Sequence, residues 1–469
     1  MFFYLIIRSR LSCALAVLLF TGCASFTPLR LDAGRTPLHV ADIKVSASAM
    51  PTADLRHYPF DPTNGLDTTE VAMLAIANNP QLRVERDQAG VAHAEAYAAG
   101  LLPDPSVSYE HDKPVGNAPG ATDSFTAALA FDLGNLVTRS ARVAAARAGE
   151  REVDLNLLWG EWQTIAQART LFDRVYYTRK LVARLRQEQA ALAPMQVAIA
   201  RALDSGELTY AVAGTGLNAA AQVNGQLAAA ERQLHQDQHD LHGLLGLGAS
   251  TPVHLAGAPF STDPDQRQVA YALAHMASQR PDLLALKAGY DAQQEKVRAA
   301  VLAQFPAITV GLVRARDNSN ISSAGFTIGL SLPLFDGNRG HIAVARATRQ
   351  QLRDAYAARL LTSRNDVRRL YADLQIDRAQ QKTLTLHAAQ LARARRAAQS
   401  NYAAGRLDWP TYLAMRESSL ASDTALLTLA ENTHATAIAL DALAGHWPDA
   451  SLAVSSARKE PRAQPENRP

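Results

Sequence analysis

One stretch of this chain limits the possible folds more than any other. Residues 341–404 contain neither glycine nor proline. As one continuous helix, this stretch would be about 96 Å long at ~1.5 Å per residue. A rod of that length exceeds the diameter of a small domain, which predicts long helices packed side by side. Apolar residues at helical spacing supply its packing seam, namely Leu352, Tyr356, Leu360, Val367, Leu370 and Leu374.

The chain also repeats a set of landmarks after about 200 residues. Asn79-Pro80 corresponds to Arg280-Pro281, Pro105 to Pro306, and Gly206 to Gly405. These matches predict a duplicated half. The predicted segments are a signal peptide (1–22), a lipidated tether and arm (23–66), a first repeat (67–250, with β-hairpin 104–135, long helix 136–203 and return helix 208–247), a second repeat (251–447, with β-hairpin 306–338, long helix 341–404 and return helix 408–445) and a disordered tail (448–469).

In both predicted hairpins, apolar residues alternate with small or polar ones. This period of two indicates strands with two different sides. The small and polar residues, such as Thr126, Ala128, Thr327 and Gly329, fit an aqueous lumen. The apolar residues, which we expect to face lipid, are Phe125, Leu129, Phe131, Ile308, Val310, Leu312, Phe326, Ile328, Leu330 and Leu332.

Four strands of this kind raise a problem that one chain cannot solve. Strands of about ten residues cross a bilayer when tilted, yet an open sheet leaves two edges that cannot face lipid. Three chains that pool their strands would give twelve strands and an aqueous lumen. The predicted fold class is therefore mainly α with a small β part: duplicated long-helix coiled-coil hairpins, plus four strands contributed to a trimeric 12-stranded transmembrane β-barrel.

The N-terminus has the layout of a secretory signal. Arg8 and Arg10 precede an apolar run over residues 11–20, and Thr21-Gly22-Cys23 follows. Small residues before Cys23 predict lipoprotein processing, which would leave Cys23 as the acylated, palmitate-bearing first residue. A plain signal peptide is the alternative. Cys13 lies inside the segment that would be removed, so one mature chain offers Cys23 no disulfide partner.

The order of elements, with Leu332-Pro333-Leu334-Phe335-Asp336-Gly337-Asn338-Arg339-Gly340 closing the second hairpin, resembles the TolC-type outer membrane efflux family. The run Gly100-Leu101-Leu102-Pro103-Asp104-Pro105 further resembles its heavy-metal subgroup, the CzcC and CusC type. The resemblance implies a lipid-anchored homotrimer in the outer membrane of a Gram-negative bacterium. It would extend into the periplasm and meet a periplasmic adaptor and a proton-driven inner membrane efflux pump. It implies a passive exit duct for small molecules or metal cations, with no cofactor and no enzymatic activity.

In this family, the turns between long and return helices form the periplasmic tip that docks the adaptor. The positions that correspond in this chain are Gly206, Glu207, Leu208, Gly405, Arg406 and Leu407. The two glycines also fit simple helix termination, and both interpretations can hold together. Asp204 and Asp408 are candidates for pore-tip carboxylates that favour cations, with solvated helix-end charges as the alternative.

Three histidines, His235, His239 and His242, fall at i, i+4 and i+7 and so share one helix face. Imidazoles in such a pattern can bind Zn²⁺ or Cu²⁺. A solvated polar face is the favoured interpretation, so no metal site is predicted, and a weak metal contact is the alternative. Zinc-protease chemistry is not favoured, because Gln236 stands where a general-base glutamate is required.

Two other function classes compete with the duct. A periplasmic adaptor or structural coiled-coil lipoprotein also has long helices and a lipid anchor, but it lacks two hairpins with apolar outer sides. A metal-dependent enzyme rests on the histidine face alone. The net charge of +3 comes without a basic patch, which argues against nucleic acid as a partner.

Overall fold

The computed structural model describes residues 26–31, 39–115, 119–260 and 262–444. The predicted signal peptide (1–22), Cys23 and the predicted tail (448–469) lie outside the described residues. The chain divides into two compact units, residues 1–36 and 37–469. The helices and strands of the described part belong to the second unit.

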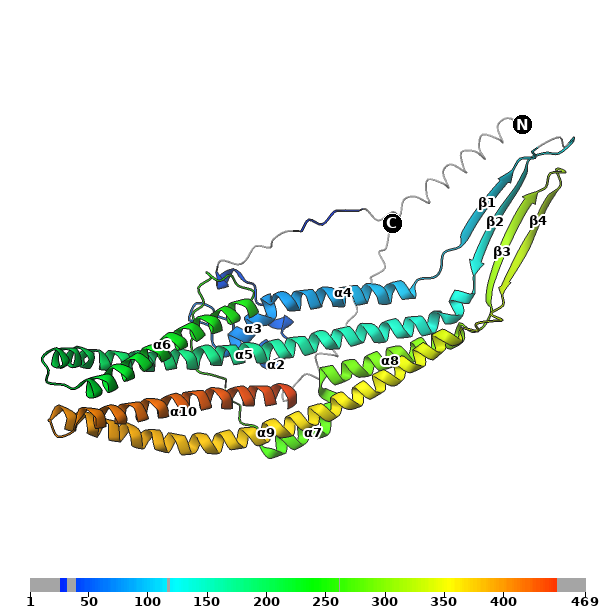
Figure 1. Cartoon of the computed structure of the whole chain (residues 1–469). Coiled ribbons are helices and arrows are strands. Elements are labelled where there is room, and N and C mark those ends of the chain that lie inside the picture. Colours follow the sequence, from blue (N-terminus) through cyan, green and yellow to red (C-terminus); the bar gives the residue numbers. More distant parts are fainter. Residues whose placement is uncertain (1–25, 32–38, 116–118, 261, 445–469) are drawn as a thin grey trace, which may run out of the picture. The chain divides into compact units, whose positions relative to one another are not determined.

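In this unit the order helix, helix, two strands, long helix and return helix occurs twice, and three short helices precede its first occurrence (Figure 1). The first half comprises η1 (Val40–Asp42), η2 (Ala47–Ala49), α2 (Ala53–His57), α3 (Thr68–Asn78), α4 (Pro80–Gly100), β1 (Ser106–Asp112), β2 (Ser124–Asp132), α5 (Gly134–Asp204) and α6 (Tyr210–Leu244). The second half comprises α7 (Gln266–Gln279), α8 (Pro281–Leu302), β3 (Ala307–Arg316), β4 (Ser322–Ser331), α9 (Arg339–Ala403) and α10 (Trp409–Ala444).

Local sequence explains where α3 and α7 begin. Asp67 Oδ1 accepts hydrogen bonds from the backbone N–H groups of Thr69 and Glu70, and the Glu70 carboxylate accepts one from Asp67 N. Asp265 forms the same capping box at the start of α7. The helices that follow, α4 and α8, both start with proline, whose fixed φ suits the first helical position.

The four strands form a single antiparallel sheet in the order β1-β2-β3-β4. Strand β2 of the first half pairs with β3 of the second half, so the two predicted hairpins join into one sheet. Strands β1 and β4 are its edges. The prediction of a mainly α chain with long helical hairpins and four strands is confirmed.

The two longest helices, α5 and α9, pack against most of the other helices. Helix α5 has 71 residues and α9 has 65, which corresponds to about 107 Å and about 98 Å at 1.5 Å per residue. Helix α5 packs against α4, α6, α8 and α10, and α9 packs against α8 and α10. The first helical hairpin therefore contacts the second mainly through α5 and α10.

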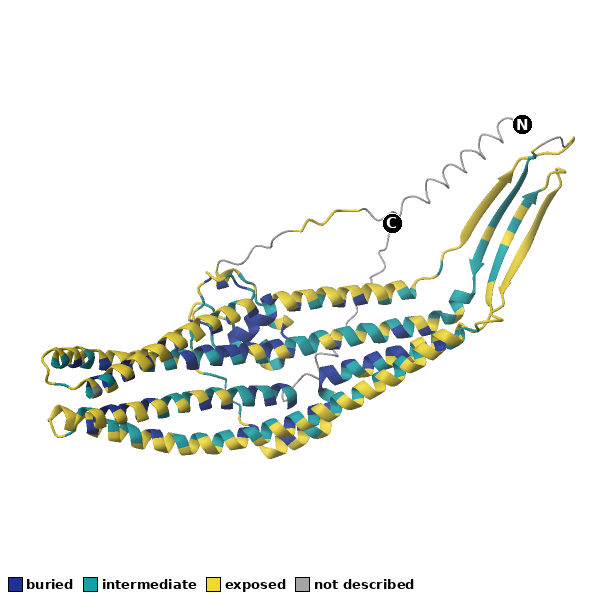
Figure 2. Ribbon diagram, viewed as in Figure 1, coloured by how far each residue is buried: buried dark blue, intermediate teal, exposed yellow. Residues whose placement is uncertain are grey.

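The largest buried cluster lies where α3 packs on α5. It includes Leu74, Trp162, Ile165, Phe172 and Leu245. Figure 2 shows the darkest concentration of buried residues at α3 and the adjoining part of α5. No helix among the described residues has both the length and the apolar content to cross a membrane.

Candidate functional site

One side of the sheet is apolar across all four strands. Residues directly opposite each other in an antiparallel pair project to the same side. Leu129 lies opposite Val107 on β1 and Leu312 on β3, and Leu312 lies opposite Phe326 on β4. Leu332 follows the last residue of β4. The register thus brings together on one side Phe125, Leu129, Phe131, Ile308, Val310, Leu312, Phe326, Ile328 and Leu330.

Strand β1 adds two residues to this apolar side that the predicted set did not contain. Val107 lies opposite Leu129, and the Tyr109 ring stacks on Phe125 with ring centroids 6.3 Å apart. The alternation in Ser106-Val107-Ser108-Tyr109 is the signal that would have revealed them. Val107 and Phe326, on the two edge strands, are each 77% exposed in the single chain. A large apolar surface is therefore uncovered.

The apolar side ends in two arginines near the loop between β3 and β4. Arg314 lies opposite Ala127, and Arg316 lies opposite Phe125. The Arg316 guanidinium carbon is 5.5 Å from the Phe125 ring centroid, and Arg316 Nη2 donates to Asp123 O at 3.2 Å. Long cationic side chains beside an aromatic ring at the end of an apolar band are typical of a membrane–water boundary.

The opposite side of the sheet carries small and polar residues. At Gly311 the neighbours approach so closely that an added Cβ would lie 2.7 Å from both Leu129 O and Thr327 Oγ1. Real Cβ atoms do not make such contacts, so this position on β3 requires glycine. The same side carries Ser108, Thr126, Ala128, Thr309, Thr327 and Gly329.

The turn between α9 and α10 ends α9 in a Schellman motif. Arg406 N donates to Asn401 O at 2.8 Å, and Gly405 N donates to Tyr402 O at 3.0 Å. Gly405 has a φ of +68°, which is the left-handed conformation that this motif requires. Helix termination is therefore one role that the backbone assigns to Gly405.

The turn between α5 and α6 has a related but longer closure. Gly206, with a φ of +73°, donates its N–H to Leu203 O at 3.1 Å. Leu208 N then reaches back to Ala202 O at 3.0 Å. Gly206 thus also terminates its helix.

Figure 1 shows both turns at the same end of the long helices. In each turn, the glycine and the charged residue that follows it are exposed, and the next residue, a leucine, is half-buried. The exposed charges have opposite signs, Glu207 in the first turn and Arg406 in the second. Arg406 Nε donates to Asn401 Oδ1 at 3.2 Å.

The two candidate tip carboxylates differ in their surroundings. Asp408 Oδ1 accepts a hydrogen bond from Thr411 N at 2.8 Å, so Asp408 caps the N-terminus of α10. The hydrogen bonds from Thr411 hold the pKa of Asp408 below its usual value. Asp204, the last residue of α5, is exposed. The structure accounts for Asp408 as a helix cap and leaves Asp204 as a surface charge.

Behind the turns, a buried ion pair joins the two helical hairpins. Arg416 Nε on α10 lies 2.7 Å from Glu188 Oε1 on α5, and both residues are nearly inaccessible to solvent. Arg416 Nη1 also donates to Tyr412 Oη at 3.0 Å. Arg184 joins the group, with Nη1 2.9 Å from Glu188 Oε2 and Nε 2.8 Å from Asp423 Oδ2. Sequence pattern does not reveal this pair, because 228 positions separate the two residues.

Aromatic residues surround the start of α10. The Tyr402 and Tyr412 rings stack with centroids 4.7 Å apart, and the Trp409 ring lies 6.0 Å from Tyr402. On α6, a Cβ at Gly216 would collide with Ile199 Cδ1 and lie 3.1 Å from Trp409 Cζ2. Glycine at position 216 therefore lets α6 approach α5 and α10 closely.

A second charged group links α5 and α10 farther from the turns. His434 Nδ1 lies 3.4 Å from Asp173 Oδ2 and 3.1 Å from Phe260 O. The hydrogen bond to Asp173 raises the pKa of His434, and burial raises the pKa of Asp173. Arg169 Nη2 lies 3.2 Å from Asp54 Oδ2, and its guanidinium carbon is 3.8 Å from the Phe260 ring centroid. These contacts attach the segment between the two halves to α5.

The three histidines of α6 do share one face. His235 Nε2 and His239 Nε2 are 3.2 Å apart, and the His239 and His242 ring centroids are 6.5 Å apart. Burial, followed by the neighbouring His239, lowers the pKa of His242. Asp237 faces the other way, is fully buried, and accepts a hydrogen bond from Thr178 Oγ1 at 2.9 Å. In the part of the chain that the structure describes, no group of three or more His, Cys, Asp or Glu side chains is arranged to hold a metal ion.

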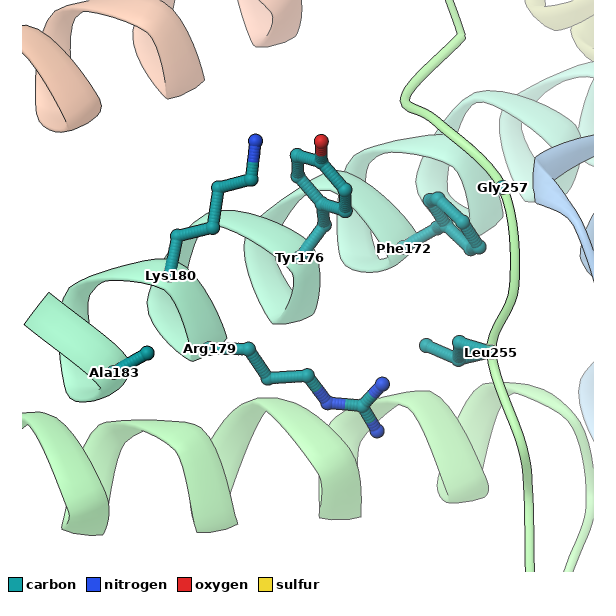
Figure 3. Close-up of a pocket in the computed structure, with 7 residues that line it drawn as sticks. All are labelled: Phe172, Tyr176, Arg179, Lys180, Ala183, Leu255 and Gly257. Carbon is teal, nitrogen blue, oxygen red and sulfur yellow. The ribbon is translucent and has the colours of Figure 1, made fainter.

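A pocket of about 240 Å³ lies beside α5. Figure 3 shows Lys180 and Tyr176 together on one side, with the Arg179 side chain extending toward Leu255. Lys180 Nζ is 4.3 Å from the Tyr176 ring centroid, and burial lowers the pKa of Arg179. The pocket is thus positively charged with a partly apolar wall. The remaining lining residues are Phe172, Ala183 and Gly257.

Comparison with known proteins identifies the second half of the chain. Residues 273–446 match the family described as outer membrane efflux protein. This segment matches the outer membrane efflux protein family. It contains α8, the β3–β4 hairpin, α9 and α10, which are the elements of the predicted resemblance. The resemblance to TolC-type outer membrane efflux proteins is confirmed.

Several solved structures share this fold over nearly the whole chain. A membrane protein from Pseudomonas aeruginosa is 20% identical, with 90% of this chain and 97% of that chain covered and a TM-score of 0.71. CusC, described as forming a transmembrane channel, is 18% identical, with coverages of 85% and 97% and a TM-score of 0.67. The open-state MtrE outer membrane channel of Neisseria gonorrhoeae is 16% identical, with coverages of 90% and 98% and a TM-score of 0.66.

At these identities the structural likeness establishes the fold. Comparison with curated protein sequences gives no match.

Proposed function

We propose that this protein is a passive exit duct in the outer membrane, and that three copies close a 12-stranded β-barrel. The observation that carries the proposal is the sheet, which has an uncovered apolar side and two open edges. The match of residues 273–446 to the outer membrane efflux family and the fold shared with outer membrane channels support the same conclusion.

The dimensions of the strands fit a bilayer. Strands β3 and β4 have ten residues each. At about 3.4 Å per residue and a tilt of about 45°, ten residues rise about 24 Å, close to the ~25 Å apolar band of outer membrane barrels. Every residue of β4 is exposed in the single chain. Pairing of β4 with β1 of a neighbouring copy would satisfy both edges, and the small and polar side would then line the lumen.

The long helices provide the periplasmic part of the duct. Rods of about 100 Å, packed side by side from three copies, would form a tunnel below the barrel. The exposed turns at Gly206-Glu207-Leu208 and Gly405-Arg406-Leu407 are the proposed contacts for a periplasmic adaptor. Asp204 is the proposed carboxylate at the tip, while Asp408 has a structural role as a cap. An inner membrane pump, proton-driven in this proposal, would supply the energy, and an acyl group on Cys23 would anchor the chain.

The alternative of a periplasmic adaptor or structural lipoprotein finds no support in the sheet. Such a protein would hold a four-stranded sheet with Val107, Leu312 and Phe326 exposed to water. Large contiguous apolar patches on soluble proteins mark an interaction surface. Lipid is the partner that matches a band bounded by Arg314 and Arg316. The transported compound, whether a small molecule or a metal cation, passes through in this proposal without chemical change.

The decisive experiment combines oligomeric state and conductance. We expect the protein to fractionate with the outer membrane, to require detergent for extraction, to migrate as a trimer that dissociates on heating, and to form stable conducting channels in a planar bilayer. Palmitate labelling of the wild type and of Cys23→Ser tests the anchor separately. A monomer that buffer alone releases from the membrane, without conductance, would refute the duct.

A further inference from the structure

We propose that His235 and His239 form a two-histidine chelate on the exposed face of α6 that binds a divalent transition-metal ion such as Zn²⁺ or Cu²⁺, with water completing the coordination. This site is separate from the proposed duct and does not depend on it. Three features support the site: the distance between the two ligating atoms, the fixed position of the helix between them, and the exposure of both rings in the single chain.

The distance between the nitrogens matches shared coordination. Zinc–imidazole bonds are about 2.0–2.1 Å long, so two nitrogens on one ion at angles of roughly 90–109° are about 2.9–3.4 Å apart. His235 Nε2 and His239 Nε2 are 3.2 Å apart. The same separation also fits a hydrogen bond between one protonated and one unprotonated imidazole. A bound ion would take the place of that proton. It would lie off the line between the two nitrogens, so both rings would turn to point their lone pairs at it.

The part of α6 between the two rings is fixed to α5 on the side opposite the histidines. Asp237 Oδ1 accepts a hydrogen bond from Gln233 Nε2 at 2.8 Å, and Asp237 Oδ2 accepts one from Thr178 Oγ1 of α5 at 2.9 Å. Leu241 is buried on the same side of α6 as Asp237. With its opposite side fixed to α5, α6 holds the backbone of both histidines in place. Ligands that are positioned before the ion arrives lose little entropy on binding.

The ligand chemistry selects the class of ion. Neutral imidazole nitrogens suit Zn²⁺, Cu²⁺ and Ni²⁺ rather than Ca²⁺ or Mg²⁺, which prefer oxygen ligands. Both rings are exposed, so an ion can reach them and keep water ligands on its open side. The next histidine on the face, His242, is partly buried, and its ring centroid lies 6.5 Å from that of His239. The chelate therefore consists of two protein ligands.

The test is calorimetric titration of the detergent-solubilised full-length protein, without a polyhistidine tag, with ZnCl₂ in a non-coordinating buffer. We expect one Zn²⁺ per chain and binding that is at least about tenfold weaker in His239→Gln, because the second ligand acts as an intramolecular contact. His275→Gln removes an exposed histidine of α7 and should leave the affinity unchanged.

A variant that moves the histidine gives the sharpest comparison. His239→Gln combined with Asp240→His keeps the number of histidines but turns the second ring by about 100° around α6. We expect this variant to bind Zn²⁺ as weakly as His239→Gln, while single-channel conductance stays unchanged in both. Equal affinity of the wild type and the moved-histidine variant, or no Zn²⁺ binding by the wild type, would overturn the proposal and leave the histidines as a hydrogen-bonded pair.

Discussion

Gly206 and Gly405 show how much a single residue can determine in this chain. Both have positive φ, at +73° and +68°, and a Cβ added at either position would meet no atom within 4 Å. Space therefore does not require glycine there, but backbone conformation does. The sequence revealed these positions because each follows a long stretch of helical residues. It did not reveal Gly311, where the backbone of the neighbouring strand excludes a side chain, or Gly216, where Ile199 and Trp409 pack close to the helix.

Alanine substitutions at the two turns should show whether backbone conformation, rather than lack of space, requires glycine there. Gly206→Ala and Gly405→Ala should each destabilise the protein by about 1–2 kcal/mol, the cost of a left-handed L-residue. Gly225→Ala is the matched control, since Gly225 lies inside α6 with open space around it. The control should stabilise by about 0.5–1 kcal/mol through helix propensity. Thermal melting followed by circular dichroism measures all three, and equal shifts in the three variants would contradict this account.

Two histidines should give opposite pH dependences of stability. His434 has a raised pKa in the folded protein because it bonds to Asp173. Its contribution is thus fully present below the unfolded pKa of ~6.5, with Asp173 ionised, and is lost as pH rises through the folded pKa. His242 has a lowered pKa because of burial and His239. Its contribution is present above pH ~6.5 and is lost as pH falls through the folded pKa.

The measurement is the free energy of unfolding of the wild type minus that of each variant across this pH range. The difference between the wild type and His434→Gln should shrink as pH rises above ~6.5. The difference between the wild type and His242→Gln should shrink as pH falls below ~6.5. Two differences that change in the same direction with pH would count against the assigned environments.

At the scale of elements, the sequence pattern predicted the individual helices and hairpins, because each lies within one continuous stretch of the chain. The absence of helix breakers over 341–404 indicated the helix that the structure contains as α9, Arg339–Ala403. Alternation with period two indicated both hairpins. What the pattern could not supply were pairings between distant segments: β2 with β3, α5 with α10, and Glu188 with Arg416. These depend on which surfaces meet, and no single window of sequence contains both partners.

The buried ion pair should dominate the contact between α5 and α10. Arg416→Ala removes the α10 partner of buried Glu188 and leaves Arg184 as its remaining partner. The loss of this charged hydrogen bond should cost about 1.5–3 kcal/mol. Replacing both residues by apolar ones, in Glu188→Leu with Arg416→Met, should cost less, because neither member of the pair is then left buried alone and Arg184 keeps Asp423 as a partner. Arg186 and Glu231 form an exposed pair at 2.7 Å. Arg186→Ala should therefore change stability by less than about 1 kcal/mol.

The free energy of unfolding of these variants, measured by chemical denaturation, decides the point. If Arg416→Ala and Arg186→Ala had equal effects, the pair would not be buried in solution as the structure has it. If the double apolar variant were as unstable as Arg416→Ala, packing rather than charge would hold α5 and α10 together.

At the scale of the whole molecule, the two sides of one strand test the proposed assembly. Phe326 and Thr327 are neighbours in the middle of β4 and project to opposite sides. Phe326→Lys places a charge on the proposed lipid side and should cost about 2–4 kcal/mol, reducing the fraction of trimer in the outer membrane. Thr327→Lys places the same charge on the proposed lumen side. It should leave the trimer intact and lower the conductance for cations.

The yield of heat-dissociable trimer and the single-channel conductance are the two readouts. Loss of trimer with Thr327→Lys but not with Phe326→Lys would reverse the assignment of the sides. A trimer unaffected by either substitution would mean that the sheet does not contact lipid.

The opposite charges of the two turns have a consequence for symmetry. The halves of the chain share a backbone plan, yet Glu207 stands in one turn where Arg406 stands in the other. In the proposed trimer, six similar turns would alternate around a ring, acidic then basic. Their geometry would approach sixfold symmetry, while their electrostatics would remain threefold. A partner ring of six identical subunits would meet two chemically different surfaces in turn, so it would have to bind in two conformations or use only every second turn.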